Sequence, residues 1–122
     1  PDTSYPIIDL LPDQNNKNDM GGSLRLGANK IDISKNSVAH KIYDSETIFR
    51  RHRHRYEFNT KFRTEFEKNG MIFSAESDGG RRMEILEVPS HKFFFGVQFH
   101  PEFNSRPGFP EAAFKTFVNA SA

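Results

Sequence analysis

The chain of 122 residues contains no cysteine and no tryptophan. The lack of cysteine excludes a disulfide framework and any zinc site built on thiolates, and it fits a cytoplasmic protein. It also means that a thiol nucleophile, if the chemistry needs one, must lie outside these residues. The apolar content is concentrated instead in 13 phenylalanines.

Long hydrophobic runs and a strong charge of one sign are missing too. No apolar run approaches the length of a membrane span, so no membrane partner is expected. A net charge of +1 gives no overall attraction to nucleic acid. The chain starts at Pro1 without a signal-peptide pattern or an initiator methionine, so we expect a fragment or a processed product.

Turn residues and hydrophobic periodicity predict a mixed chain of helices and strands. Ser77-Asp78-Gly79-Gly80 has the composition of a hairpin turn, and the polar residues 12–22 are expected to form a loop. The expected helices, with their N-terminal signals, are 36–43 with Asn36 or Ser37, 61–68 with Thr60, and one that begins at Pro110. The expected strands are 5–11, 24–33, 48–58, 71–75, 83–88 and 93–99.

The last of these strands carries the most informative residues. Residues 93–99 are apolar enough for burial on both faces, and they are followed by His100-Pro101-Glu102. Imidazole can act as base and then as acid near neutral pH, and a carboxylate on its other nitrogen fixes the tautomer. His100 and Glu102 are therefore candidate catalytic residues. The alternative is a surface histidine beside a solvated carboxylate.

Four stretches of the chain carry a resemblance to known enzymes. Gly96–Glu102 (Gly-Val-Gln-Phe-His-Pro-Glu) resembles the His-Glu motif of class I glutamine amidotransferases. Gly21–Gly27 (Gly-Gly-Ser-Leu-Arg-Leu-Gly) is similar to the Gly-Gly-Thr-Met-Arg-Leu-Gly stretch of the CTP synthase family, with Leu24 in place of methionine. Arg51–Glu57 (Arg-His-Arg-His-Arg-Tyr-Glu) and Phe103–Pro107 continue the similarity, which covers nearly the whole chain in the same order.

The resemblance implies a fold and a place within it. The fold would be α/β, class I glutamine amidotransferase-like, with a flavodoxin-like, doubly wound and mostly parallel sheet. Residues 1–122 would be the C-terminal portion of that domain, without its upstream half and without the synthetase domain. The elbow cysteine of the family lies in the upstream half, so the isolated chain is expected to be inactive.

The resemblance also implies an activity for the parent enzyme, an ATP-dependent ligase that aminates UTP to CTP with ammonia from glutamine. His100 and Glu102 would complete a Cys-His-Glu triad. The partners would be L-glutamine, the synthetase domain with UTP, Mg-ATP and the effector GTP, and further copies in a cytoplasmic homotetramer. No cofactor and no metal are expected in this chain.

The basic run 50–55 allows several interpretations. A nucleic-acid patch is disfavoured by the low net charge, and a metal site at His52 and His54 lacks a clear third ligand. A charged edge strand is the structural alternative. By resemblance, Arg55 binds the α-carboxylate of glutamine, for which a guanidinium is well suited, and Tyr56 lines the pocket.

The segment 13–26 is expected to couple the two domains of the parent enzyme, with Gly21, Gly22 and Arg25 as the candidates; the alternative is an ordinary surface loop. Two other functions remain open. One is another class I amidotransferase, such as one for GMP or anthranilate synthesis, although the run Arg51–Arg55 favours the CTP synthase family. The other is a non-catalytic binding or regulatory module that keeps the fold, which the lack of cysteine would favour.

Overall fold

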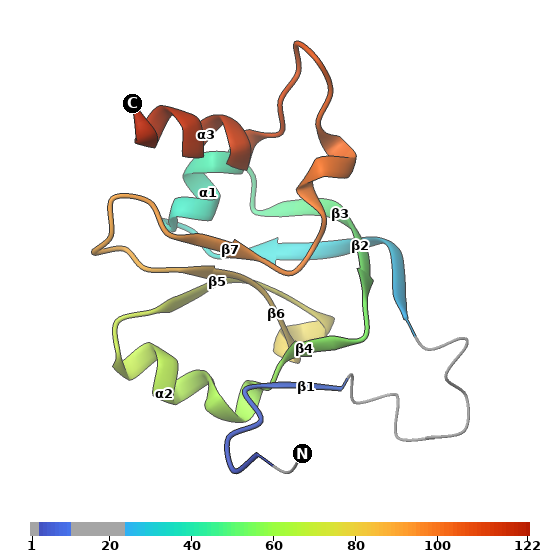
Figure 1. The fold of residues 1–122 in the computed structure, drawn as a ribbon, viewed down its shortest axis with the longest axis vertical. Helices are drawn as coiled ribbons and strands as arrows, with labels where there is room; N and C mark the ends of the chain where they lie inside the picture. The colour runs from blue at the N-terminus through green and yellow to red at the C-terminus, as the bar shows by residue number, and fades with distance from the viewer. Residues whose placement is uncertain (1–2, 11–23) are drawn as a thin grey trace.

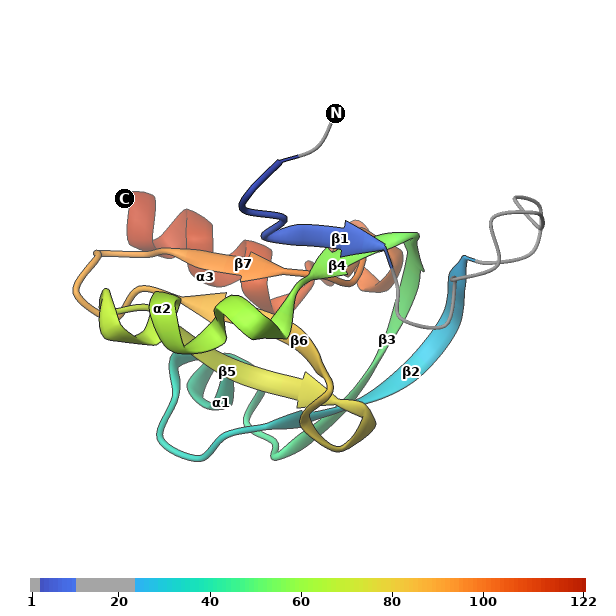
Figure 2. The same cartoon turned by 90° about the horizontal axis from the view of Figure 1, so that it is seen from below.

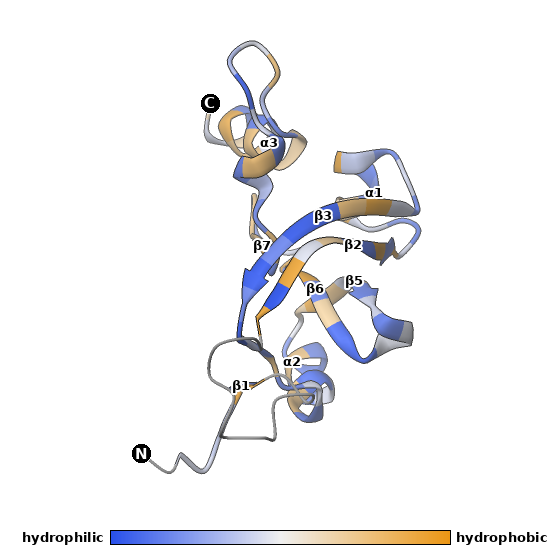
Figure 3. Ribbon diagram, turned by 90° about the vertical axis from the view of Figure 1, so that its right-hand side faces the viewer, coloured by the Kyte–Doolittle hydropathy of each residue, from blue (hydrophilic) through white to orange (hydrophobic). Residues whose placement is uncertain are grey.

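The computed structural model describes residues 3–10 and 24–122, and Figure 1 shows their arrangement. A five-stranded sheet runs in the order β3-β2-β5-β6-β7, and a separate pair consists of β1 and β4. Figures 1 and 2 both show β1 beside β4, and Figures 1 and 3 place α1 and α3 toward one end of the molecule and α2 toward the other. The strands are β1 (Ile8–Leu10), β2 (Arg25–Ile33), β3 (Thr47–His54), β4 (Tyr56–Phe58), β5 (Ile72–Ser77), β6 (Arg82–Glu87) and β7 (Phe95–Val97); the helices are α1 (Val38–Tyr43), α2 (Arg63–Lys68) and α3 (Ala112–Ser121).

The mixed α/β class is confirmed, but the sheet differs from a parallel one. Every strand pair among the described residues is antiparallel. The β5–β6 and β6–β7 connections are too short for a parallel pair, which needs a crossover of a dozen or more residues, whereas β2 and β5 are antiparallel although a long segment joins them. The expected hairpin is present: β5 and β6 pair around Asp78–Gly80, where Asp78, Gly79 and Gly80 all have positive φ. The predicted loop 12–22 lies outside the described residues. The strands predicted before and after it, 5–11 and 24–33, correspond to β1 and β2.

The prediction of a single strand over 48–58 is wrong, because the segment forms two strands. It breaks at Arg55 into β3, which pairs with β2, and β4, which pairs with β1. The two halves face different partners, so the chain must bend between them. Figure 3 shows that β3 changes from apolar near α1 to hydrophilic toward this bend.

The strand predicted over 93–99 is shorter and less buried than expected. Only Phe95–Val97 form β7, which pairs with β6 at the edge of the described sheet and is half-buried. Phe94 is 46% exposed, whereas Phe99 is buried. Because a run of phenylalanines is apolar at every position, its sequence cannot tell which faces of the strand are covered.

The helix caps partly match the predictions. The Ser37 side chain caps α1 by accepting a hydrogen bond from the His40 N–H, as expected. Thr60 is not a cap: the Asn59 side chain accepts from the Lys61 N–H, and one 3₁₀ turn over Thr60–Phe62 precedes α2. Asparagine is one of the strongest capping residues, which explains why the turn starts one residue earlier.

Two buried glutamates fix helices against the sheet. The Glu87 carboxylate on β6 accepts from the Val38 and Ala39 N–H groups at 3.0 and 2.6 Å and so satisfies the start of α1. The Glu111 carboxylate caps α3 through the Ala113 N–H at 2.8 Å and pairs with Arg50 of β3 at 3.2 Å. The second contact links α3 to the same strand that leads to the bend.

The hydrophobic core lies between the five-stranded sheet and α1. Its buried members are Ile31, Ile33, Ala39, Ile48, Ala75, Ile85 and Phe99. A second cluster joins Phe58, Phe66 and Phe73, whose ring centroids are 4.5 to 6.1 Å apart, and seats α2. Helix α3 is seated by few of its own side chains, because Ala113 is buried whereas Phe114 and Phe117 are 40% and 56% exposed.

Replacement of a core isoleucine tests which side chains belong to the hydrophobic core. Ile31 is fully buried, so Ile31→Ala should lower the free energy of unfolding by about 2–5 kcal/mol through lost burial and an unfilled cavity. Ile72→Ala is the matched control, since Ile72 is 44% exposed and its truncation should cost about 1 kcal/mol or less. Urea unfolding of the purified protein that contains this chain measures both, and equal losses would contradict the assigned core.

Candidate functional site

His100 and Glu102 lie together immediately after the sheet. The buried Phe99 ends the segment that follows β7, and Pro101 begins a 3₁₀ turn over Pro101–Asn104. The His100 Nδ1 atom lies 2.6 Å from the Glu102 Oε1 atom. Proline restricts the backbone between the two residues, so the turn holds both side chains on one side.

Three contacts fix the imidazole of His100. Its Nδ1–H donates to Glu102, its ring stacks on Phe103 with centroids 5.2 Å apart, and its backbone N–H donates to the Arg51 carbonyl at 2.9 Å. The side chain of His100 is 36% exposed, so it is held and yet accessible. A proton on Nδ1 leaves Nε2 as the ring nitrogen that can take up a proton.

The Glu102 carboxylate is suited to orient this histidine. The hydrogen bond from His100 lowers the pKa of the Glu102 carboxyl below its ordinary value. The group is therefore ionised at neutral pH, and a carboxylate can only accept hydrogen bonds. This fixes the tautomer of His100 and favours an imidazolium when it forms.

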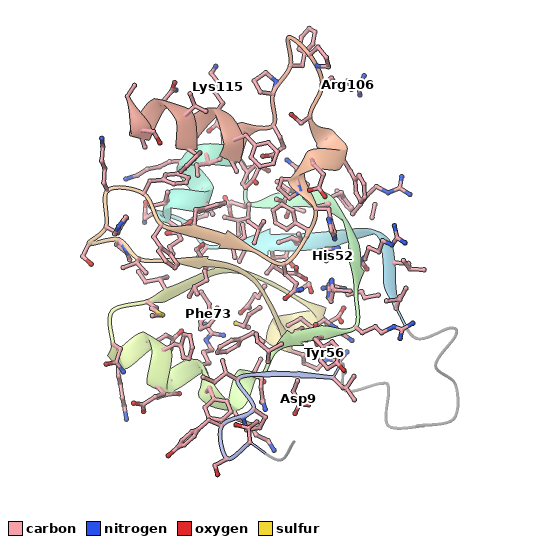
Figure 4. All side chains as sticks on the ribbon, viewed as in Figure 1. Asp9, His52, Tyr56, Phe73, Arg106 and Lys115 are labelled. Atoms are coloured by element: carbon pink, nitrogen blue, oxygen red, sulfur yellow. The ribbon has the colours of Figure 1, made fainter. Side chains whose placement is uncertain are left out.

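Arg55 and Tyr56 lie at the bend between β3 and β4. Arg55 is half-buried, and Tyr56 is 57% exposed (Figure 4). Two hydrogen bonds bring this bend near the His100 segment: the Gln98 side-chain Nε2 donates to the Tyr56 carbonyl at 3.4 Å, and the His100 N–H donates to the carbonyl of Arg51, four residues before Arg55. The structure thus brings together the two predicted groups, the His100 segment and the Arg55 bend, across a separation of 42 residues between Gln98 and Tyr56.

The third predicted group is only partly described. Gly21 and Gly22 lie outside the described residues. Arg25 is the first residue of β2, and its guanidinium contacts the Glu84 Oε1 atom at 2.5 Å and the Ser77 Oγ atom at 2.9 Å. Its side chain is 9% exposed, so Arg25 binds into the sheet, whereas its role in coupling two domains stays a prediction.

Around Arg25 lies a buried polar network that the sequence did not predict. Glu84 on β6 accepts from Arg25 and from the Ser77 hydroxyl at 2.6 Å through Oε1, and from His52 Nε2 at 2.8 Å through Oε2. The side chains of Glu84 and His52 are both fully buried. Figure 4 labels His52, a residue of β3, close to β2.

The ionisation of Glu84 follows from these contacts. Burial alone would raise the pKa of the Glu84 carboxyl, but the hydrogen bonds from His52 and Ser77 and the charge of Arg25 outweigh burial and lower it. A signal for this network was present in the sequence, because Glu84 interrupts the apolar run 83–88 and a carboxylate inside a buried strand needs partners.

The two histidines of the basic run have different surroundings. His52 binds Glu84, whereas His54 Nε2 is 3.8 Å from the Glu57 carboxylate, and the two rings meet edge to face at 5.4 Å. Within residues 3–10 and 24–122, no group of three or more His, Asp or Glu side chains is arranged to hold a metal ion. Over the same residues, no helix is long and apolar enough to cross a membrane.

Comparisons with known proteins show the family of this chain. The sequence profile of the family "Glutamine amidotransferase class-I" matches residues 7–120. The CTP synthase of Staphylococcus haemolyticus is 54% identical over 121 residues, which are 99% of this chain and 23% of that protein. The CTP synthase of Archaeoglobus fulgidus is 53% identical over 119 residues, 98% of this chain and 22% of that protein.

A solved structure gives the same result for the fold. The glutaminase domain of Trypanosoma brucei CTP synthase, with bound acivicin, superposes with a TM-score of 0.88 at 38% identity, over 98% of this chain and 47% of that one. The chain therefore spans less than a quarter of the length of the curated relatives and about half of the solved domain. With a family profile that matches nearly all of its residues, the chain belongs to the class I glutamine amidotransferases.

Proposed function

We propose that this chain is the C-terminal part of the glutaminase domain of a CTP synthase. The observation that carries the proposal is the 2.6 Å contact between His100 Nδ1 and Glu102 Oε1, in a chain about half identical to CTP synthases of bacteria and archaea. The complete enzyme would use ATP to activate UTP and glutamine to supply ammonia. The likeness to these relatives supports this choice.

The proposed glutaminase step divides the work among three groups. A cysteine outside these residues attacks the side-chain amide carbon of glutamine, and His100 takes up the thiol proton at Nε2. The C–N bond then breaks, and the imidazolium gives that proton to the departing ammonia. Glu102 holds the tautomer throughout, and water afterwards releases glutamate from the thioester.

Arg55 is proposed to bind the α-carboxylate of glutamine, with Tyr56 beside it in the pocket. The position of the bend next to the His100 segment supports this role. A planar guanidinium can bind a carboxylate through two hydrogen bonds, which fixes the orientation of the substrate as well as its affinity.

The remaining parts of the complete enzyme are proposals of the same kind. Mg-ATP, UTP and the effector GTP would bind to the synthetase domain or at its border with the glutaminase domain, and no cofactor is assigned to this chain. Assembly as a homotetramer and a cytoplasmic location follow from the family resemblance. Gly21, Gly22 and Arg25 are proposed to lie where the two domains communicate.

Replacement of the proposed base separates the two activities of the complete enzyme. His100→Ala should lower glutamine-dependent CTP formation by about 10²–10⁴-fold, the usual contribution of a general acid–base, but leave CTP formation from added ammonia unchanged. His91→Ala is the control, because His91 is an exposed histidine on the loop before β7 and should affect neither activity. Loss of both activities in His100→Ala would show that the residue supports folding instead.

Replacement of the proposed substrate arginine tests glutamine binding. Arg55→Ala should raise the KM for glutamine by about 30- to 800-fold, which corresponds to roughly 2–4 kcal/mol for a lost charge-assisted pair. Ammonia-dependent CTP formation should not change. Arg81→Ala, which removes an exposed guanidinium at the β5–β6 turn, is the matched control. An unchanged glutamine KM in Arg55→Ala would refute the assignment.

A further inference from the structure

Two charged residues of β6, Arg82 and Glu84, stand two positions apart, and alternate residues of a strand lie on the same face. The side chain of Glu84 is fully buried and that of Arg82 is 11% exposed. A charge taken so far out of water is stable only with close partners. The partners of these two residues lie on either side of the Arg55 bend.

Glu84 holds the chain before the bend. Its Oε2 atom accepts from His52 Nε2 at 2.8 Å, and the Asn29 Nδ2 atom on β2 lies 3.3 Å from His52 Nδ1, to which it can donate. The imidazole is therefore fixed between a carboxylate on β6 and an amide on β2. This fixes the position of β3 three residues before Arg55.

Arg82 holds the chain after the bend. Its Nη1 atom contacts the Glu57 Oε1 atom at 2.8 Å, and Glu57 is buried on β4, two residues after Arg55. The Nε atom of Arg82 also donates to the Asp78 carboxylate at the β5–β6 turn. Asp78 thus orients the Arg82 guanidinium, which forms an ion pair with Glu57.

Glu84 extends the same support to the neighbouring strand. Its Oε1 atom contacts Arg25, which stands directly opposite His54 in the pairing of β2 with β3. The end of β3 is therefore held by Glu84 of β6 directly, through His52, and also by β2, whose Arg25 contacts the same Glu84 carboxylate. The contacts of the clamp residues with His52 and Glu57 lie within three residues of Arg55, and Arg25 lies across from His54.

We propose that Arg82 and Glu84 form a clamp that positions the Arg55 bend, so that both are positioning residues for glutamine binding. The clamp rests on the proposed role of Arg55. A guanidinium binds a carboxylate through two hydrogen bonds only in a narrow range of orientations, and a shift of about 1 Å at a positioning group can cost about 100-fold. Neither side chain needs to touch the substrate.

The test uses Glu84→Gln in the complete enzyme, with Glu87→Gln as the matched control. Both glutamates are buried on β6, but Glu87 binds the start of α1 instead of β2 and β3. Glu84→Gln should raise the glutamine KM by about 10- to 100-fold and keep ammonia-dependent CTP formation. Glu87→Gln should leave the glutamine KM unchanged, although both variants lose stability. Equal KM values in the two variants would overturn the clamp.

A double variant shows whether the effect passes through Arg55. In an Arg55→Ala background, Glu84→Gln should raise the KM no further, because residues that act through one another are not additive. Multiplication of the two effects would overturn the proposal. An unchanged glutamine KM in Arg55→Ala alone would instead refute the glutamine-binding role of Arg55, and with it the role of the clamp in glutamine binding.

The other arm of the clamp guards against a Glu84→Gln protein that fails to fold. Arg82→Lys keeps the charge but loses the planar fork, so it should raise the glutamine KM several-fold with ammonia-dependent activity intact. Arg81→Lys, at the adjacent exposed position, is its control. Identical KM values for Arg82→Lys and Arg81→Lys would overturn the role of Arg82, and with it the clamp.

Discussion

A carboxylate buried inside a sheet must be satisfied by its neighbours, and the Glu84 side chain imposes this requirement on β2, β3 and β5. Its two oxygens accept from Arg25, Ser77 and His52, one donor from each of these strands. The arrangement leaves little freedom for the strands to slide, because loss of one partner would leave a buried charge without compensation. The register of the polar end of the sheet therefore depends on this one group.

Strand β3 transmits that constraint to both parts of the candidate site. Its Arg51 carbonyl accepts from the His100 N–H, and its last residues lead into the bend at Arg55. One residue before Arg51, in the middle of the strand, Arg50 pairs with Glu111 and lies over the Tyr43 ring at 4.9 Å. Strand β3 thus fixes the His100 segment, the Arg55 bend and α3 relative to one another. The proposed acid–base and substrate-binding groups are consequently placed by the same element.

The sequence predicted what local contacts determine. His100 and Glu102 meet because two residues with a proline between them form a single turn, and the β5–β6 hairpin forms because its turn residues tolerate positive φ. The break at Arg55 was missed because the run around it is uniformly charged and gives no sign of a change of partner. The contacts of Glu84 were missed because they join residues 32 and 59 positions apart, and no local pattern reports such distances. The family resemblance, in contrast, assigned the candidate residues without any of these contacts.

The proposed triad is divided unequally between local and distant structure. The base and its orienting carboxylate come from one turn, so their geometry is complete before any other segment of a glutaminase domain is considered. Glu102 occupies Nδ1 and Phe103 stacks on the ring, which leaves Nε2 as the ring nitrogen for the proposed proton transfer. A cysteine supplied by another part of the polypeptide then needs only to reach a base that is already oriented. This order also places the demand for accuracy on the proposed substrate side, where the Arg55 bend is positioned by contacts between strands, whereas the base depends on one turn.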